Sequence, residues 1–243
     1  MNSFLTLAFL FFVGSVVGWV MELLFRHFTS KEKKWINPGF CLGPYLPIYG
    51  FGLCVLYLIA GLEKWNFVAD PTLNKVVLFT CMALAMTAIE YIAGILCLKA
   101  FNVRLWDYSD LPGNIQGIIC PQFSLIWAVL GAAYYFLIHP YILDALAWLS
   151  RNLAFSFFIG LFYGVFLIDV ACSARIVTKI RQFARDNDVI ANYEKLKDHI
   201  HSIHTRSKEK YRFFFPLRSS RPLQEHLKDM RASLEQVRKK RKE

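Results

Sequence analysis

Five long apolar stretches constrain this chain more than any other feature of its sequence. A bilayer core of about 30 Å is crossed by a helix of about 20 apolar residues, and in lipid only helices or closed barrels satisfy the backbone. The sequence therefore predicts an all-α integral membrane protein with about five transmembrane helices. The predicted spans are 4–25, 45–62, 76–98, 118–138 and 152–172.

The distribution of charge separates a membrane part from a solvated part. The chain has 243 residues, is 56% hydrophobic and carries a net charge of +10. Residues 1–172 hold nine basic and nine acidic residues, whereas residues 173–243 hold 19 and nine, so the tail carries the whole excess. Such asymmetry predicts two domains. These are a transmembrane domain over 1–172 and a basic cytoplasmic helical tail over 173–243.

Basic residues near the ends of the spans predict the orientation of the chain. The first loop contains Lys31, Lys33 and Lys34, and the tail begins with Arg175 and Lys179. The loops after the second and fourth spans carry little net charge. Cytoplasmic loops are enriched in Lys and Arg. The first loop and the tail are therefore predicted in the cytoplasm, with the N-terminus outside.

Two of the predicted cytoplasmic loops can be aligned with each other. NPGFCLGPYLPIYG (37–50) matches NIQGIICPQFSLIW (114–127) at a constant offset of 77. Each segment follows a span with an acidic residue and leads directly into the next span. This pattern predicts a parallel repeat of 4–62 and 76–138, an arrangement common in transporters. The matched pairs are Asn37 with Asn114 and Pro44 with Pro121.

The first of these loops is dense in glycine and proline, including Pro44 and Pro47. Irregular backbone near membrane depth survives only where protein or a water-filled cavity covers it, and broken helix ends there often line substrate sites. Asn37, Pro44 and Pro47, with Asn114 and Pro121, are therefore candidate residues of a substrate path. The alternative is that both loops are ordinary helix starts, because proline suits a first helical turn.

Acidic residues inside the spans are the other candidates. Glu22, Glu90 and Asp169 lie within predicted spans, where a carboxylate is costly and therefore a functional candidate. Glu90 stands out because fourteen uncharged residues precede it and no basic residue lies within a turn or two. The alternative is pairing at the interface with Arg26, Arg104 or Arg175.

The segment Trp106, Asp107 and Tyr108 is polar and aromatic, and it lies on the predicted cytoplasmic side. Tryptophan and tyrosine suit the lipid headgroup zone. The segment is therefore predicted either to anchor the chain at the membrane surface or to form a docking or substrate-facing loop.

Two G-x-x-x-G motifs lie in the first and fifth spans. Glycines at this spacing share one helix face and allow another helix to approach closely. The partner helix can belong to the same chain or to a second copy in a homodimer. The glycine pairs are Gly14 with Gly18 and Gly160 with Gly164.

These strings resemble a known family. GWVMELLFR (18–26), NPGFCLGPYLPIYGFG (37–52) and WDYSDLP (106–112), followed by NIQG and CPQFSLIW, are similar to the bacterial CmpB-like family of ABC-transporter permeases. The likeness covers about residues 1–175, with Gly113 standing where a bulkier residue is expected. It implies a permease subunit in a bacterial inner membrane. A separate ATPase is then needed as a partner, because the sequence has no G-x-x-x-x-G-K-[ST] phosphate loop.

The tail contains two apolar seams with helical 4-3 spacing, which predict two short heptad helices. Neither helix is stable alone, so the seams are expected to pair with each other or to form a coiled coil with a partner. A membrane scaffold or sensor that recruits a partner through this tail is therefore the second functional hypothesis. The seams are Val189, Tyr193, Leu196, Ile200 and Ile203, and Leu223, Leu227, Met230, Leu234 and Val237.

Several other functions have little support in the sequence. An intramembrane enzyme acting on a lipid or peptide is the third hypothesis, but no nucleophile and base stand at a recognisable spacing. The six cysteines form no C-x-x-C pair and fit small apolar packing residues. Membrane tethering explains the basic tail without nucleic acid. The sequence therefore predicts no catalytic site, no metal, no cofactor and no nucleic-acid partner.

The predicted topology can be tested with single cysteines. A cysteine at Asn66 should react with an impermeant thiol reagent in intact cells, because the second loop is predicted outside, whereas one at Ser207 should not. Labelling measured before and after the cells are opened checks this. The reverse pattern would overturn the predicted orientation.

Overall fold

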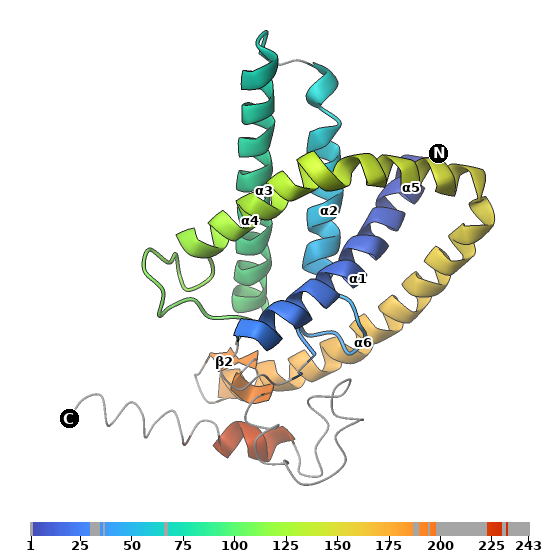
Figure 1. The fold of residues 1–243 in the computed structure, drawn as a ribbon. Helices are drawn as coiled ribbons and strands as arrows, with labels where there is room; N and C mark the ends of the chain where they lie inside the picture. Colours follow the sequence, from blue (N-terminus) through green and yellow to red (C-terminus); the bar gives the residue numbers. More distant parts are fainter. Residues whose placement is uncertain are drawn as a thin grey trace.

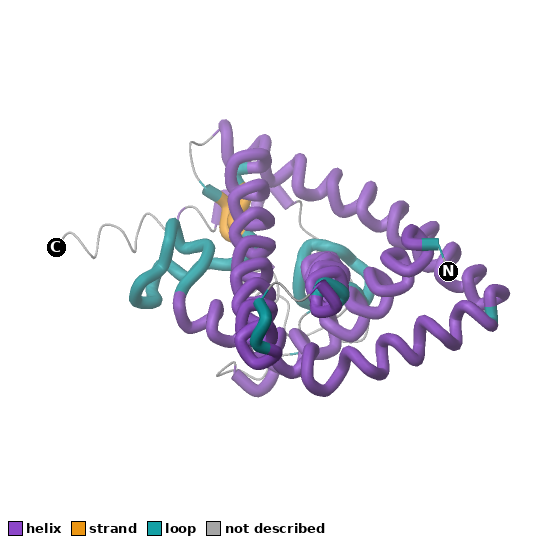
Figure 2. Tube along the Cα trace, turned by 90° about the horizontal axis from the view of Figure 1, so that it is seen from above, coloured by secondary structure: helices purple, strands orange, loops and turns teal. Residues whose placement is uncertain are grey.

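The computed structural model describes most of the chain, and nearly all of the described part is helical (Figure 2). The described residues are 2–29, 35, 37–65, 68–186, 190–193, 195–197, 223–229 and 232. The α-helices are α1 (Ser3–Thr29), α2 (Pro47–Ala60), α3 (Pro71–Phe101), α4 (Pro121–Ala133), α5 (His139–Arg151) and α6 (Ser156–Asp186). Shorter elements are η1 (Glu63–Trp65), the π-helix η2 (Tyr134–Ile138), η3 (Leu153–Phe155), β1 (Val103–Arg104) and β2 (Ala191–Asn192). Residues 223–229 are also helical.

Within the described residues, five helical stretches are long and apolar enough to cross a bilayer. The prediction of a multi-pass, all-α membrane protein is therefore confirmed. The stretches are Ser3–Phe28, Pro47–Trp65, Pro71–Phe101, Pro121–Arg151 and Leu153–Asp186. In Figure 1, α2 and α3 run side by side, and the long unit of α4, η2 and α5 crosses them.

The fourth predicted span differs most from its sequence-based boundaries. It begins at Pro121, passes through the π-helix η2 and continues as α5 to Arg151. The predicted loop over 139–151 is therefore wrong. Pro140 is compatible with this helix because proline fits its first turn. The helix is amphipathic, and one face buries Ile142, Leu146 and Leu149.

The last span extends beyond its predicted end. Helix α6 continues to Asp186, so residues 173–186 of the predicted tail belong to the same helix as the span. No glycine or proline interrupts the sequence from Val165 to Asp186. The extension has its own apolar face, which buries Val177, Ile180 and Ala184 at helical spacing.

Prolines begin several of the helices. Pro47 and Pro121 lie in the first turns of α2 and α4, where the missing N–H of proline leaves no bond unmade. These two prolines are 74 positions apart. Pro44 instead lies in the loop before α2. At the helix starts, Pro121 therefore corresponds to Pro47, whereas the sequence alignment pairs it with Pro44. The parallel repeat itself stays a prediction.

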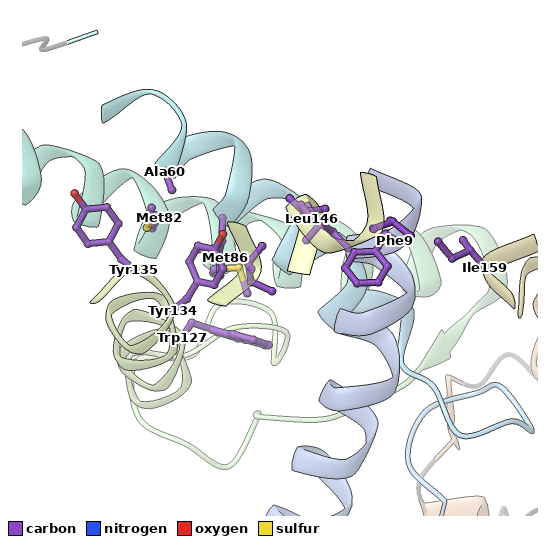
Figure 3. Close-up of a cluster of buried hydrophobic side chains, with 13 residues drawn as sticks. Phe9, Ala60, Met82, Met86, Trp127, Tyr134, Tyr135, Leu146 and Ile159 are labelled. Atoms are coloured by element: carbon purple, nitrogen blue, oxygen red, sulfur yellow. The ribbon is translucent and has the colours of Figure 1, made fainter. Parts of the chain in front are cut away.

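One apolar core holds the spans together. It combines buried side chains from α1, α2, α3, the α4–η2–α5 unit and α6, several of which are drawn in Figure 3. Met82 and Met86 of α3 meet Trp127 of α4 and Tyr134 of η2 in this cluster. Contacts among residues far apart in sequence therefore fix how the spans cross.

The two glycine motifs have different surroundings. A Cβ at Gly18 would overlap Cβ and Cγ of Tyr49, and one at Gly14 would lie 2.9 Å from Leu53 Cβ. The partner of the first motif is thus α2 of the same chain, so the predicted homodimer contact through Gly14 and Gly18 is wrong. At Gly160 and Gly164, an added Cβ meets nothing within 4 Å in the described chain. A homodimer through that pair stays a prediction.

A second apolar cluster joins the tail to the loop end of the spans. Val103 of β1 pairs with Ala191 of β2, and both contact the end of α6. Leu196 and Leu227, one from each predicted seam, are fully buried in the same cluster. The described members of the two seams therefore meet each other and the end of α6. The predicted first heptad helix is wrong at Ala191–Asn192, which form strand β2 instead because they pair with β1. The other seam positions Val189, Ile200, Ile203, Met230, Leu234 and Val237, like Asn66 and Ser207, lie outside the described residues.

The close approach of α1 and α2 predicts unequal effects of adding one methyl group. Gly18→Ala should displace Tyr49 and lower the free energy of unfolding by about 1–3 kcal/mol through overpacking. Gly160→Ala is the matched control and should not destabilise the monomer, since its Cβ meets nothing within 4 Å in the described chain and alanine favours a helix by up to about 1 kcal/mol over glycine. Thermal unfolding of the purified variants checks this, and equal midpoints would contradict the described packing.

The tail cluster predicts a second pair of variants. Leu227→Asp should release the tail from α6. It removes a buried leucine side chain, whose burial stabilises the fold by about 2 kcal/mol, and it places a charge in the apolar cluster. Lys228→Asp, at an exposed neighbouring position, should leave the tail in place. Limited proteolysis of the full-length protein measures the release. Equal cleavage of the two variants would contradict the observed packing.

Candidate functional site

A cavity of about 300 Å³ lies where α1 ends and α2 begins, beside the second half of α3. Helix α4, the loop after α3 and Tyr193 of the tail complete its wall. Five of the residues singled out in the sequence line it, although they come from four separate segments. They are Glu22, Pro47, Glu90, Trp106 and Tyr108.

Glu22 is held by two donors. Arg26 Nε donates to its Oε1 at 2.6 Å, and the hydroxyl of Tyr49 donates to its Oε2 at 2.7 Å. The predicted pairing of Glu22 with Arg26 is therefore confirmed. Because Tyr49 lies in the first turns of α2, the same carboxylate ties α1 to the start of α2.

Glu90 continues the buried face of α3 and is only 3% exposed. Its Oε1 accepts a hydrogen bond of 3.0 Å from the hydroxyl of Tyr108. Its Oε2 is buried and meets no described donor in full hydrogen-bond geometry, but the indole N–H of Trp127 lies close enough to stabilise the charged carboxylate. Burying a carboxylate among neutral donors alone costs free energy. Glu90 is thus the least satisfied charged group of the cavity.

Aromatic rings connect the two carboxylates. The ring centroid of Trp127 lies 5.3 Å from that of Tyr49, and Tyr108 stacks on Phe123 at 4.3 Å. Glu22 and Glu90 are close enough to repel each other electrostatically. The cavity therefore has two acidic groups in largely aromatic and aliphatic walls.

The loop after α3 is an ordered structure that presents Trp106 and Tyr108 to the cavity. The indole Nε1 of Trp106 donates to the carbonyl of Ile118 at 2.8 Å. Asp107 accepts from Arg104 Nη1 and from the hydroxyl of Ser109, both at 2.6 Å. Burial alone raises the pKa of Asp107, but the hydrogen bonds from Ser109 and Arg104 outweigh it and leave that pKa lowered. Arg104 thus pairs with Asp107 rather than with an acid in a span.

Asn114 closes the other part of the same loop. Its Nδ2 donates to the carbonyl of Leu111 at 2.8 Å, and its Oδ1 accepts from the N–H of Gly117 at 3.0 Å. Gly113 and Gly117 both have positive φ values, 69° and 67°, which favour glycine. The bulkier residue expected at Gly113 would therefore be strained. Asp107, Asn114 and Pro121 shape this loop and the start of α4 but do not line the cavity.

Asp169 of α6 anchors the loop before α2. Its carboxylate accepts from the N–H of Leu42 at 3.0 Å, from the N–H of Gly43 at 2.7 Å and from the hydroxyls of Tyr45 and Ser173. The alternative for Asp169 was pairing with an arginine such as Arg175 at the interface. In the structure, Asp169 instead receives hydrogen bonds from the loop before α2 and from Ser173. It lies outside the cavity lining.

Asn37 is 1% exposed and organises the same loop from within. Its Oδ1 accepts from Trp19 Nε1 at 2.6 Å, and its Nδ2 donates to the carbonyl of Leu42 at 2.9 Å. The buried amine of Lys197 donates to the carbonyl of Asn37 at 3.0 Å and to that of Gly39. Asn37 therefore has a structural role, and Pro44 of the same loop is exposed outside the cavity.

The Cys41 thiol of the loop before α2 is not activated. Burial, with Asp169 nearby, raises the pKa of the Cys41 thiol to about 12, so the thiol stays protonated at neutral pH. Within the described part of the chain, no three metal-ligating side chains come together.

Sequence reasoning missed Tyr49, Trp127, Tyr193 and Lys197 as parts of this region. Tyr49 and Trp127 lie at the ends of the two aligned loop segments. The alignment therefore indicates that both residues are near helix starts, where the other candidate residues lie. Tyr193 was assigned only to an apolar seam, yet its ring reaches the cavity wall and its hydroxyl lies 3.5 Å from the carbonyl of Phe40. No local pattern marks Lys197 as buried.

Comparison with known proteins supports one family. No curated protein and no solved structure matches the chain. The family described as "Putative ABC-transporter type IV", of CmpB type, matches residues 9–174, which is more than half of the chain and covers α1 to most of α6. The matched region contains every residue of the cavity wall except Tyr193. The chain therefore belongs to this ABC-transporter type IV family.

Proposed function

We propose that this chain is the permease subunit of an ABC-type transport system in a bacterial inner membrane, driven by a separate ATPase. The observation that carries the proposal is the cavity that brings together Glu22 of α1 and Glu90 of α3. Membership of the ABC-transporter type IV family supports it. In the proposed orientation the N-terminus is outside and the tail is cytoplasmic, which places the cavity in the inner half of the bilayer.

The buried acids favour a transport path over a purely structural core. Charged residues within spans are costly and commonly mark substrate or ion pathways. Among the described residues, Glu90 forms no ion pair in the packing of α3, and its hydrogen bond of 3.0 Å comes from the neutral hydroxyl of Tyr108. The irregular segment before Pro47 also fits a transporter, since non-helical backbone beside a cavity is a common way to build a substrate site.

The loop over 102–120 is the proposed docking region for the ATPase. Its hydrogen bonds make it rigid, and it presents Trp106 and Tyr108 directly to the cavity. Asp110 is exposed in this loop. A partner that moves the loop would therefore also move the side chain that donates to Glu90, which couples docking to the substrate site.

The partner can be identified by gentle purification. The full-length protein, tagged and isolated from its native membranes in mild detergent, should co-purify with a protein that contains a G-x-x-x-x-G-K-[ST] motif. Asp110→Lys should reduce that recovery about tenfold if this loop is the docking region, because it reverses an exposed charge. Quantitative mass spectrometry of the bound fraction measures this.

The matched control is Asp144→Lys, which reverses an exposed charge on α5. It should leave recovery of the ATPase unchanged. Equal loss in both variants would remove this loop as the docking region. Recovery of a partner without an ATPase motif, dependent on the tail over 187–243, would replace the permease proposal with the scaffold hypothesis.

A further inference from the structure

The charges in the cavity wall do not balance. The charged residues that line it, as far as the structure describes them, are Glu22, Arg26 and Glu90. Glu22 and Arg26 neutralise each other across 2.6 Å. Glu90 has no cationic partner among these described residues, and the groups that face it, the Tyr108 hydroxyl and the Trp127 indole, are neutral donors. A ligand that completes this site should therefore carry one positive charge and a hydrogen-bond donor or a diffuse cationic surface.

The aromatic lining favours a particular kind of cation. Tyr49, Trp106, Tyr108 and Trp127 all line the cavity around the carboxylates. Tryptophan and tyrosine faces attract substituted ammonium groups through cation–π interactions, which strengthen when water is excluded. Small hydrated metal ions prefer several oxygen ligands instead. The geometry is therefore better matched to an organic ammonium group.

The remaining wall favours an apolar tail on that ammonium group. Most of the lining is aliphatic or aromatic, including Ile89 and Ala93 of α3. Phe51 and Leu96 line the cavity and are also 58% and 59% exposed, so the wall reaches the outer surface of α2 and α3. In a bilayer this surface faces lipid, so an amphiphilic ligand has a route into the cavity from the membrane.

We propose that the cavity binds an amphiphilic organic ammonium ion, with Glu90 as its counter-ion and Trp127 and Tyr108 against its cationic head. This inference rests on the proposed function in taking the cavity as the substrate site. An anionic ligand is disfavoured because, among the described lining residues, two are carboxylates and the one arginine is already paired with Glu22. The ammonium group can belong to a free lipophilic amine or to an ethanolamine lipid headgroup.

The test compares two probes of one shape. (4-Phenylbutyl)trimethylammonium and its neutral isostere, with carbon in place of nitrogen, are titrated calorimetrically into the full-length protein in uncharged maltoside micelles, with protein-free micelles as the blank. Wild-type protein should bind the cation at least about tenfold more tightly than the isostere, since only the cation meets Glu90 and the aromatic faces. Equal affinity for the two probes would overturn the inference.

Variants assign the effect to the cavity. Glu90→Gln should reduce affinity for the cation about tenfold and leave affinity for the isostere unchanged. Asp144→Asn, which removes an exposed carboxylate of α5 that does not line the cavity, should change neither. Unchanged affinity of Glu90→Gln for the cation would overturn the role of Glu90.

If Glu90→Gln does not fold, Glu90→Asp and Trp127→Phe replace it. Glu90→Asp should keep the preference for the cation, and Trp127→Phe should reduce it a few-fold.

Two further comparisons separate the outcomes. A short-chain phosphatidylethanolamine should displace the probe if the ammonium group comes from a lipid, whereas displacement only by a free alkylamine indicates a soluble or partitioned amine. Cation binding without a co-purified ATPase would leave the ammonium site standing and remove the permease proposal. If an ATPase co-purifies but the protein binds the cation and the isostere equally, the permease proposal stands and the ammonium site is removed.

Discussion

The structure depends on how polar groups are satisfied at the end of the spans where the loops gather. In lipid, every buried backbone or charged group needs a partner within the protein. Asp169 meets this requirement for the loop before α2 by accepting from two backbone N–H groups. Lys197 meets it for two carbonyls of the same loop. Without these contacts the irregular segment before Pro47 would leave its backbone groups unpaired, and α2 would lose the fixed position of its first turn.

The position of that first turn has consequences for the cavity. Tyr49 donates to Glu22 from α2, while Gly18 allows the tyrosine to lie directly against α1. The ring of Tyr49 then contacts Trp127 of α4. Anchoring of the loop by α6 and the tail is thus transmitted through α2 to the wall that contains Glu90. The tail contributes more than charge, because Tyr193 is itself part of that wall.

The two acids of the cavity differ in how completely they are satisfied. Glu22 has an arginine and a tyrosine hydroxyl, one for each oxygen. Among the described residues Glu90 meets only neutral donors, the hydroxyl of Tyr108 on one oxygen and the indole of Trp127 nearby. A protein retains such a costly group only when something else offsets its free energy, and a ligand of opposite charge is the simplest source. This difference separates an acid that an arginine neutralises within the fold from one that has no cationic partner among the described residues.

The sequence by itself determined the class of fold. Its spans are long and apolar enough to lie in lipid, where helices satisfy the hydrogen bonds of the backbone. It also identified Glu22, Glu90, Trp106 and Tyr108, since acids within spans and aromatic residues at their ends are unusual enough to detect locally. It could not tell that Asp169 and Asn37 support a loop while Glu90 lines a cavity. That distinction depends on contacts between residues more than a hundred positions apart, such as Asp169 with Leu42 and Lys197 with Asn37. Only the tertiary structure decided it, because the helical period of a span fixes which face a residue occupies but not which other helix or loop meets that face.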